Sequence, residues 1–288
     1  MQSIPSSSIL IMIGNPPYND TTSEFRNGEK GINLCDSDLT DRDTGISFLK
    51  SYNKLKADIV CVLHPLSYLI KEANFKRLRG FKDNYNLVKG EIFSSSLFEE
   101  TGTAKFPVLI ALYERNTSGM TFEHIYNFKF DVLDNNNKFI LSEYKTTDGY
   151  INKYPPRKND MQESPISLYY YTFRDINSLK KNTSFISIKH YNGIVITLEN
   201  FYKYAYLYSF KNLFNPENAW LYGNLSPLGN SEEIEKYKKL YILYAVKKHP
   251  IIGKMANNIL KFYGIRKSNK DDISKIENKI QKIINGLI

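Results

Sequence analysis

Hydrophobic and polar positions follow two different periodicities along the first third of the chain. Residues 8–13 and 58–63 are apolar at nearly every position, which is typical of strands buried on both faces of a parallel sheet. Helical spacing of apolar residues over 44–54 and 67–81 predicts two helices. Residues 87–93 and 106–113 predict two further strands. This order of strands and helices predicts an α/β fold.

The pattern changes after residue 118. Short aromatic and β-branched runs separated by Asn-rich turns predict a β-rich segment between residues 120 and 214; the runs are 122–130, 139–144, 168–173, 185–189 and 193–198. Three helices are expected after residue 230, over 232–248, 251–263 and 272–287. In the last of them an apolar stripe is formed by Ile273, Ile276, Ile280, Ile283 and Leu287. This stripe predicts that the helix packs against the rest of the protein. We therefore expect two domains, residues 1–118 and 119–288.

Composition narrows the class of protein. Hydrophobic residues make up 42% of the 288 residues and charged residues 24%, which excludes a disordered chain. Two cysteines cannot support a disulfide scaffold. The apolar runs are much shorter than the roughly 18 residues of a membrane-spanning helix, and residues 1–8 lack the basic start of a signal peptide. We therefore expect a soluble, cytoplasmic protein with no membrane partner. Its net charge of +9 permits a nucleic-acid partner without demonstrating one.

The sequence Gly14-Asn15-Pro16-Pro17-Tyr18 directly follows the first predicted strand. Ligands of open α/β sheets bind at the carboxyl ends of the strands. Two prolines fix two φ angles and remove two N–H donors, so the local carbonyl groups become rigid acceptors. An Asn side-chain oxygen and a neighbouring carbonyl can together accept both protons of an exocyclic amine, and the Tyr offers a flat face to a planar base. The motif therefore predicts a site that holds an aromatic amine in one orientation.

The same segment resembles a motif of a known family. Ile11–Tyr18 (I-M-I-G-N-P-P-Y) looks like motif IV of the amino-methylating DNA methyltransferases, whose pattern is Asp/Asn/Ser-Pro-Pro-Tyr/Phe/Trp. The resemblance continues through a strand that ends in Pro within Ala57–Ile70, a basic helix at Phe75–Phe81 and the region of motif VIII at Ser96–Arg115. It covers roughly residues 9–116. It is most like the gamma-class adenine-N6 branch, which includes large fused restriction–modification enzymes.

This resemblance implies a fold, a reaction and residue roles. The fold would be the C-terminal half of a Rossmann-like methyltransferase sheet, followed by a β-rich and helical target-recognition region. The reaction would transfer a methyl group from S-adenosylmethionine to adenine N6 in double-stranded DNA. Asn15 and the Pro16 carbonyl would accept hydrogen bonds from adenine N6, with Pro17 completing the motif. Tyr18 would stack on the flipped base, and Phe98 matches the family's second stacking aromatic.

A cofactor-binding loop is missing from the sequence. The gamma class carries a glycine-rich loop upstream of motif IV, and none of the fourteen residues before Asn15 fits it. Glycines within 222–229 and 263–265 follow no predicted buried strand, so the cofactor-binding residues stay unassigned. We therefore expect a protein partner that carries the cofactor-binding half. The alternatives are a truncated or degenerate gene product and a piece of a longer protein. A different interpretation is a non-catalytic DNA-binding or specificity subunit of a restriction–modification system.

Four other residues are candidates for substrate contact. His64 ends a predicted strand at the same edge as the motif, where it either lines the pocket or satisfies local hydrogen bonds. Lys153, Arg157 and Lys158 belong to a basic, turn-prone loop that also contains an aromatic residue. Such a loop is a candidate for contact with the DNA backbone.

Metal-dependent chemistry has little support in the sequence. Glu143 and Lys145, with Asp131 and Asp134 before them, loosely match the acidic pattern of metal-dependent nucleases. Surface charges on strands explain the same residues. The two cysteines and four histidines lack metal-ligand spacing, so no metal site is expected.

Overall fold

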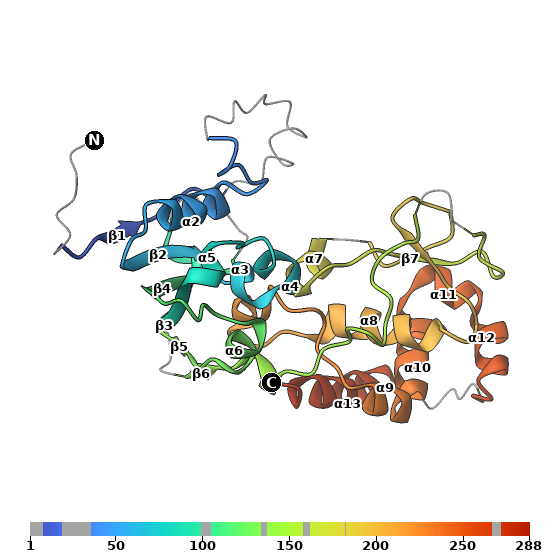
Figure 1. Ribbon diagram of the computed structural model, residues 1–288. Coiled ribbons are helices and arrows are strands. Elements are labelled where there is room, and N and C mark those ends of the chain that lie inside the picture. Colours follow the sequence, from blue (N-terminus) through green and yellow to red (C-terminus); the bar gives the residue numbers. More distant parts are fainter. Residues whose placement is uncertain are drawn as a thin grey trace. The chain divides into compact units, whose positions relative to one another are not determined.

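The computed structural model describes residues 8–18, 36–98, 105–133, 137–157, 162–181, 183–266 and 272–288. Contacts divide the chain into two units, residues 1–143 and 144–288 (Figure 1). The first unit is built on a six-stranded mixed sheet and the second on helices and a three-stranded sheet, so the chain is a mixed α/β protein.

The sheet of the first unit has the strand order β1-β2-β4-β3-β5-β6. Its strands are β1 (Ile11–Gly14), β2 (Ile59–Pro65), β3 (Tyr85–Ser94), β4 (Pro107–Arg115), β5 (Phe130–Val132) and β6 (Lys138–Phe139). β1 pairs parallel to β2, and β4 runs antiparallel between β2 and β3. β1, β2 and β3 therefore run in the same direction and end at the same edge of the sheet, called here the carboxyl edge.

The apolar run of residues 8–13 predicts a strand buried on both faces, and that prediction is wrong. The missing cofactor-binding strands predict instead an unpaired apolar edge, and β1 forms such an edge. Among the described residues, β1 pairs with β2 alone and lies at the edge of the sheet. Ile9, Ile11 and Ile13 are 70%, 54% and 80% exposed. An apolar strand is buried only where other parts of the protein cover both of its faces. The local sequence does not show whether such neighbours are present.

Helix α2 (Thr44–Lys54) matches its expected range. It begins at Asp43, whose carboxylate accepts a hydrogen bond from the Gly45 N–H at 3.0 Å. Ile46, Leu49 and Tyr52 form its buried face.

The helix expected over 67–81 is three short helices instead, α3 (Ser67–Ile70), α4 (Glu72–Phe75) and α5 (Phe81–Asn84). Lys71 is extended with ψ 111°, which ends α3. Gly80 has a φ of 76°, a conformation that favours glycine and that starts α5 on a new axis.

The segment after residue 118 belongs to the first unit as far as Glu143. Residues 122–130 were expected to be extended, but α6 (Phe122–Asn127) occupies most of them. The Thr121 hydroxyl caps this helix by accepting from the His124 N–H at 3.1 Å. β5 and β6 then extend the first sheet beyond β3. The compact unit therefore extends past the expected boundary at residue 118.

The second unit combines a small antiparallel sheet with a bundle of helices. The sheet has the order β8-β7-β9, with β7 (Tyr169–Tyr171), β8 (Phe185–Ile186) and β9 (Gly193–Val195). Its helices are α7 (Ile176–Lys181), α8 (Phe201–Leu213), α9 (Ser231–Lys236), α10 (Lys238–Lys248), α11 (Pro250–Lys254), α12 (Ala256–Phe262) and α13 (Ile273–Asn285), with a 3-10 turn, η5, at Ala219–Tyr222.

Two helices show what the sequence pattern predicted and what it missed. α13 packs on α10 and α8, so the expected docking helix is confirmed. Its buried positions are Ile276, Ile280 and Ile284, so the predicted stripe missed Ile284, and its other members Ile273, Ile283 and Leu287 are only half-buried. Residues 201–213 were expected to belong to a β-rich segment, and they form α8. This helix is aromatic on nearly every side because the unit surrounds it, so it has little amphipathic periodicity to detect.

Candidate functional site

The N-P-P-Y motif lies at the carboxyl edge of the first sheet, directly after β1. Asn15 is exposed, Pro16 is buried, Pro17 is exposed and Tyr18 is half-buried. Burial of Pro16 anchors the turn to the unit while the Asn15 side chain stays open to solvent. The motif therefore presents the Asn15 amide to a ligand from a turn that the two prolines make rigid.

Tyr18 binds one side of the acceptor that a ligand would use. Its hydroxyl donates a hydrogen bond to Asn15 Oδ1 at 2.7 Å. Burial raises the pKa of Tyr18 to about 12, so the hydroxyl remains a proton donor at neutral pH. The amide oxygen has two lone pairs, so the second one remains for an incoming amine.

Gly14 allows α2 to approach the motif. A Cβ atom at Gly14 would overlap the hydroxyl group of Tyr52, which belongs to the buried face of α2. A larger residue would require the Tyr52 ring to move. The glycine before Asn15 therefore lets this ring pack directly against the end of β1.

A network of polar side chains fixes the start of α2 near the motif. The Tyr68 hydroxyl donates to Asp43 Oδ1, and Arg77 pairs with Asp41. Lys50 Nζ also binds Asp41, at 3.0 Å. Burial raises the pKa of Asp43. Burial also pushes the pKa of Asp41 upward, but hydrogen bonds from its neighbours outweigh burial and lower it. Sequence reasoning missed this network, although an Asp directly before a predicted helix is a recognisable cap.

Phe98 shares the carboxyl edge with the motif but is not next to it. It follows β3 after the 3-10 turn Ser95–Leu97, and β2 and β4 lie between β3 and β1. Three strand spacings amount to about 14 Å. The Phe98 ring packs edge-on against Phe93, with the ring centres 5.7 Å apart.

His64 lies inside the first unit and has no exposed surface. Its Nδ1 donates to the Pro65 carbonyl at 3.0 Å, and its Nε2 accepts from the Tyr113 hydroxyl at 2.7 Å. The ring also stacks on Tyr68. Both ring nitrogens are satisfied and no surface is open to a ligand, so we assign His64 to the core and not to the substrate site.

The basic loop predicted to contact DNA lies in the second unit. Lys153 binds Asp148 at 2.5 Å and the Ser226 hydroxyl at 2.6 Å, so its ammonium group holds the loop in place. Arg157 is exposed, and Tyr154 beside it is 52% exposed. Lys158 lies outside the described residues. The structure therefore leaves Arg157 and Tyr154 as the surface groups of this loop.

No metal centre is formed by the described residues. They contain no group of three or more His, Cys, Asp or Glu side chains that could hold a metal ion. Asp131 pairs with Lys138 across β5 and β6, and Glu143 ends a short 3-10 turn. Asp134 is not among the described residues.

The candidate glycines for the cofactor do not form a cradle in the described structure. Gly223 follows η5, and a Cβ there would overlap the Asn177 side chain. Gly229 packs against Tyr206, and Gly264 follows α12. None of these three glycines follows a strand, whereas the loop that holds a nucleotide-like cofactor does.

Comparisons of the chain with protein-family models, with curated proteins and with solved structures gave no match. Among the helices of the described residues, none combines the length and the apolar character needed to cross a membrane. Function is therefore inferred from the geometry and chemistry of the site.

Proposed function

We propose that this chain is the catalytic-loop and DNA-recognition portion of a site-specific DNA N6-adenine methyltransferase of a restriction–modification system. The observation that carries the proposal is the position of Asn15–Tyr18. An exposed amide oxygen and a neighbouring aromatic ring lie on a rigid turn at the carboxyl edge of parallel strands. That is the edge at which open α/β sheets bind ligands.

The acceptors of this turn select an exocyclic amine. Asn15 Oδ1 and the Pro16 carbonyl are acceptors, so a base with a carbonyl group at this position would leave them unpaired. Unpaired acceptors cost about 1–3 kcal/mol each when they are buried. The geometry therefore favours an amine-bearing base, and the resemblance to motif IV names adenine N6 as that amine.

The described residues do not fit the methyl donor that this reaction needs. No glycine-rich turn follows a strand at Gly223, Gly229 or Gly264. We therefore assign to this chain the positioning of the amine, and we place S-adenosylmethionine binding in a protein partner that carries the other half of the sheet.

The exposed edge of β1 supports such a partner. Natural proteins avoid exposed apolar edge strands because these pair with other chains. Here Ile11 and Ile13 lie two residues apart on one face of β1, Ile9 comes just before the strand, and all three are more than half exposed. A strand paired with β1, with a helix over these side chains, would cover both the backbone edge and the apolar face.

The distribution of charge supports a DNA partner. The second unit has 23 Lys and Arg against 12 Asp and Glu, a net charge of +11, whereas the first has 16 against 18, a net charge of −2. The two values add up to the +9 of the chain. The positive charge therefore belongs to the unit in which the target-recognition region is expected, where it would attract the phosphate backbone.

Calorimetric titration of the isolated chain with S-adenosylmethionine tests the assignment of the two halves. We expect no heat of binding, because the described residues form no cradle for the cofactor. Adding the partner half should produce both cofactor binding and transfer of labelled methyl groups to duplex DNA. Tight cofactor binding by the chain alone would contradict the division into halves.

Substitution of Ile13 by lysine tests the role of the β1 edge. We expect the purified wild-type chain to self-associate at micromolar concentration through this edge, and Ile13→Lys to weaken association about tenfold, or roughly 1.4 kcal/mol. Sedimentation velocity at several concentrations measures the effect. Ile188→Lys is the matched control, because Ile188 is 77% exposed in the second unit. A wild-type chain that stays monomeric, or equal effects of both variants, would contradict the role of the edge.

A second candidate function is a non-catalytic DNA-binding or specificity subunit. The lack of a cofactor cradle among the described residues favours it, because a chain that only binds DNA does not need one. This candidate predicts DNA binding that persists while no cofactor-binding partner restores methyl transfer. Restored transfer would eliminate it.

A further inference from the structure

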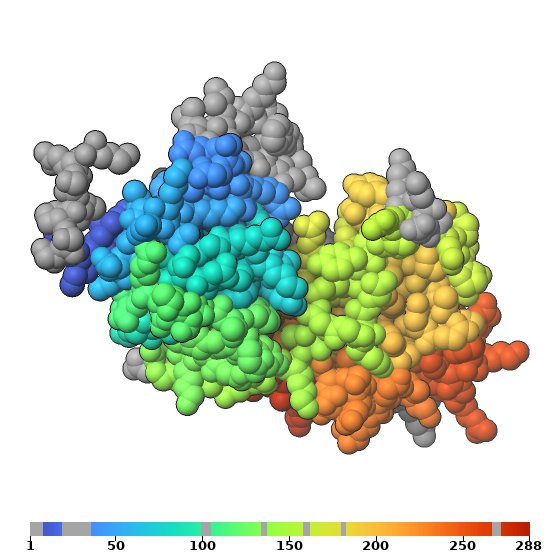
Figure 2. All heavy atoms as spheres, in the orientation of Figure 1, coloured from blue at the N-terminus to red at the C-terminus, as the bar shows by residue number. Residues whose placement is uncertain are grey.

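The segment Lys236–Arg266 belongs to the longest run of the second unit that contains no acidic residue. Its 31 residues contain eight Lys and Arg and no Asp or Glu. They form α10, α11 and α12, together with the residues that connect them. Figure 2 shows this orange-to-red part of the chain at the surface of its unit. Such a density of one sign of charge creates a strong local potential for an anionic partner.

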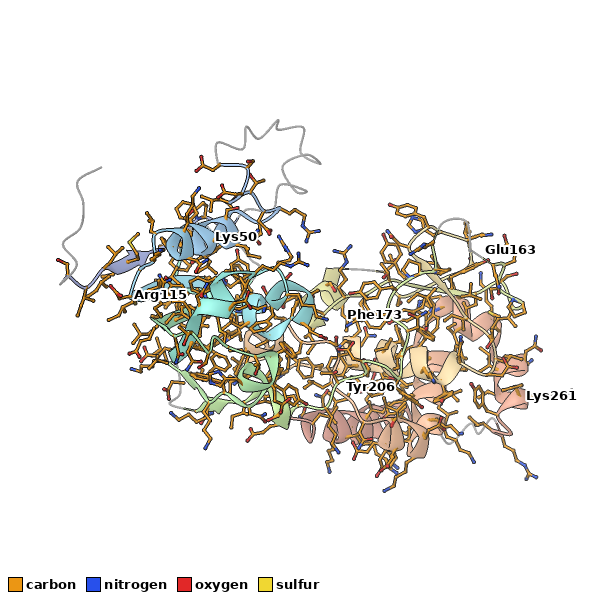
Figure 3. All side chains as sticks on the ribbon, in the orientation of Figure 1. Lys50, Arg115, Glu163, Phe173, Tyr206 and Lys261 are labelled. Carbon is orange, nitrogen blue, oxygen red and sulfur yellow. The ribbon has the colours of Figure 1, made fainter. Side chains whose placement is uncertain are left out.

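α12 has one buried and one polar face. Ala256, Ile259 and Leu260 are buried. Asn257, Asn258 and Lys261 are exposed on the other side of the helix, and Figure 3 shows Lys261 on the outside of the unit. This helix therefore offers two amides and an ammonium group to solvent.

Cationic residues come before and after Asn257 and Asn258 in the sequence. Lys254 ends α11 just before α12, and Arg266 follows α12; both are exposed. No carboxylate of the described residues forms an ion pair with Lys254, Lys261 or Arg266. Elsewhere in the segment, Lys238 pairs with Glu235 and Lys248 pairs with Glu277. The cations around α12 are therefore available to an external anion.

We propose that α12 and its flanking residues form a duplex-DNA contact surface, called here the α12 surface and consisting of Lys254, Asn257, Asn258, Lys261 and Arg266. The three cations would contact phosphates, and the two amides would contact base edges. The inference deepens the proposed function, since duplex DNA is the substrate there. It names the residues that hold and read that substrate.

Duplex DNA fits this surface better than a membrane does. An interfacial helix needs a broad apolar face toward the lipid, whereas the exposed face of α12 carries two amides and Lys261, with Phe262 as its single large apolar group. DNA offers phosphates for the cations and base edges for the amides. Asn forms a bidentate pair with adenine N6 and N7 in the major groove, and this pairing suits a target site that contains adenine.

The phosphate contacts are tested by the salt dependence of DNA binding. Fluorescence anisotropy of a labelled 30-base-pair duplex is measured from 50 to 200 mM salt for the full chain. The triple variant Lys254→Gln, Lys261→Gln, Arg266→Gln should lower the slope of log K against log salt by about 0.9 for each lost contact, close to 3 in all. At 50 mM salt its affinity should fall at least tenfold.

The matched control removes the same charge from another helix. Lys275, Lys279 and Lys282 are exposed on α13. Their replacement by Gln should change the slope of log K against log salt by less than the roughly 0.9 expected for one lost phosphate contact. Equal losses in both triple variants would show a general charge effect and overturn the α12 surface. Absence of duplex binding by the wild-type chain would overturn it too, as would binding to vesicles of phosphatidylserine and phosphatidylcholine in place of DNA.

The amides are tested by sequence preference. Selection from a random duplex pool should enrich an adenine-containing motif with the wild-type chain and no motif with Asn257→Ala, Asn258→Ala, while binding to bulk duplex stays within about threefold. Enrichment of the same motif by both proteins would overturn the role of the amides. Neither experiment measures methyl transfer, so a chain that binds through the α12 surface without methylating would refute the proposed function alone.

Discussion

Replacement of Asn15 by alanine is expected to reduce DNA methylation by the assembled enzyme on the order of 100-fold, the typical loss when one positioned hydrogen-bond partner of a reacting group is removed. Asn15 Oδ1 is the exposed acceptor at the carboxyl edge, and alanine cannot accept a hydrogen bond. Because the side chain is exposed, the free energy of unfolding should change by no more than about 0.5 kcal/mol. Transfer of labelled methyl groups to duplex DNA, with DNA affinity measured in parallel, checks both expectations.

Substitutions of Tyr18 provide the matched controls. Tyr18→Phe keeps the ring and removes the hydroxyl that binds Asn15 in the free protein, so activity should be retained or rise slightly. Tyr18→Ala removes the ring, and stacking on a base is worth about 1–3 kcal/mol. Methylation that survives in both Asn15→Ala and Tyr18→Ala would refute the assignment of the catalytic loop.

Acidification is expected to destabilise the first unit through His64. Burial lowers the pKa of this imidazole from 6.5 to about 4. The unfolded chain therefore binds a proton at higher pH than the folded chain does. The contribution of His64 to stability is fully present above pH 6.5 and is lost as the pH falls through 6.5 to 4. The difference between the two pKa values corresponds to about 3 kcal/mol.

Substitution by a neutral side chain isolates this effect. His64→Gln should flatten the loss of stability between pH 6.5 and 4, because glutamine does not titrate there. Tyr113→Phe removes the hydrogen bond to Nε2 and should cost about 1 kcal/mol, while the pH dependence remains. Hydrogen exchange of β2 and β4 amides reports on the first unit, and Trp220 fluorescence follows the second. An unchanged pH dependence in His64→Gln would contradict the assignment.

Much of the first unit could be predicted from local pattern. The range of α2 and the positions of β2, β3 and β4 follow from hydrophobic periodicity and from the turn residues between them. Hydrophobic periodicity gave a wrong prediction where single residues interrupt a helix, or where packing against distant parts of the chain decides the conformation. An extended Lys71 and the positive φ of Gly80 divide the helix expected over 67–81. α8 shows the opposite case, because an aromatic segment favours strands until a surrounding bundle buries it as a helix.

The residues of the candidate site also differ in how well the sequence alone could place them. Asn15 to Tyr18 could be located from sequence because two prolines after an apolar strand form a local signal. His64 and Lys153 could not be assigned in this way. A histidine at a strand end and a lysine in a turn are placed by partners far away in the chain: Tyr113 for His64, and Ser226 for Lys153.

The sequence by itself determined an α/β first unit, the position of the N-P-P-Y turn after a strand and the positive charge of the chain. Tertiary structure decided how far the side chains of Ile9, Ile11 and Ile13 are exposed, that His64 belongs to the core, that the Tyr18 hydroxyl binds Asn15, and that the cations around α12 remain exposed. The physical reason is the range of the interactions. Periodicity and turn chemistry act within a few residues, whereas burial, strand pairing and ion pairing depend on residues that only folding brings together.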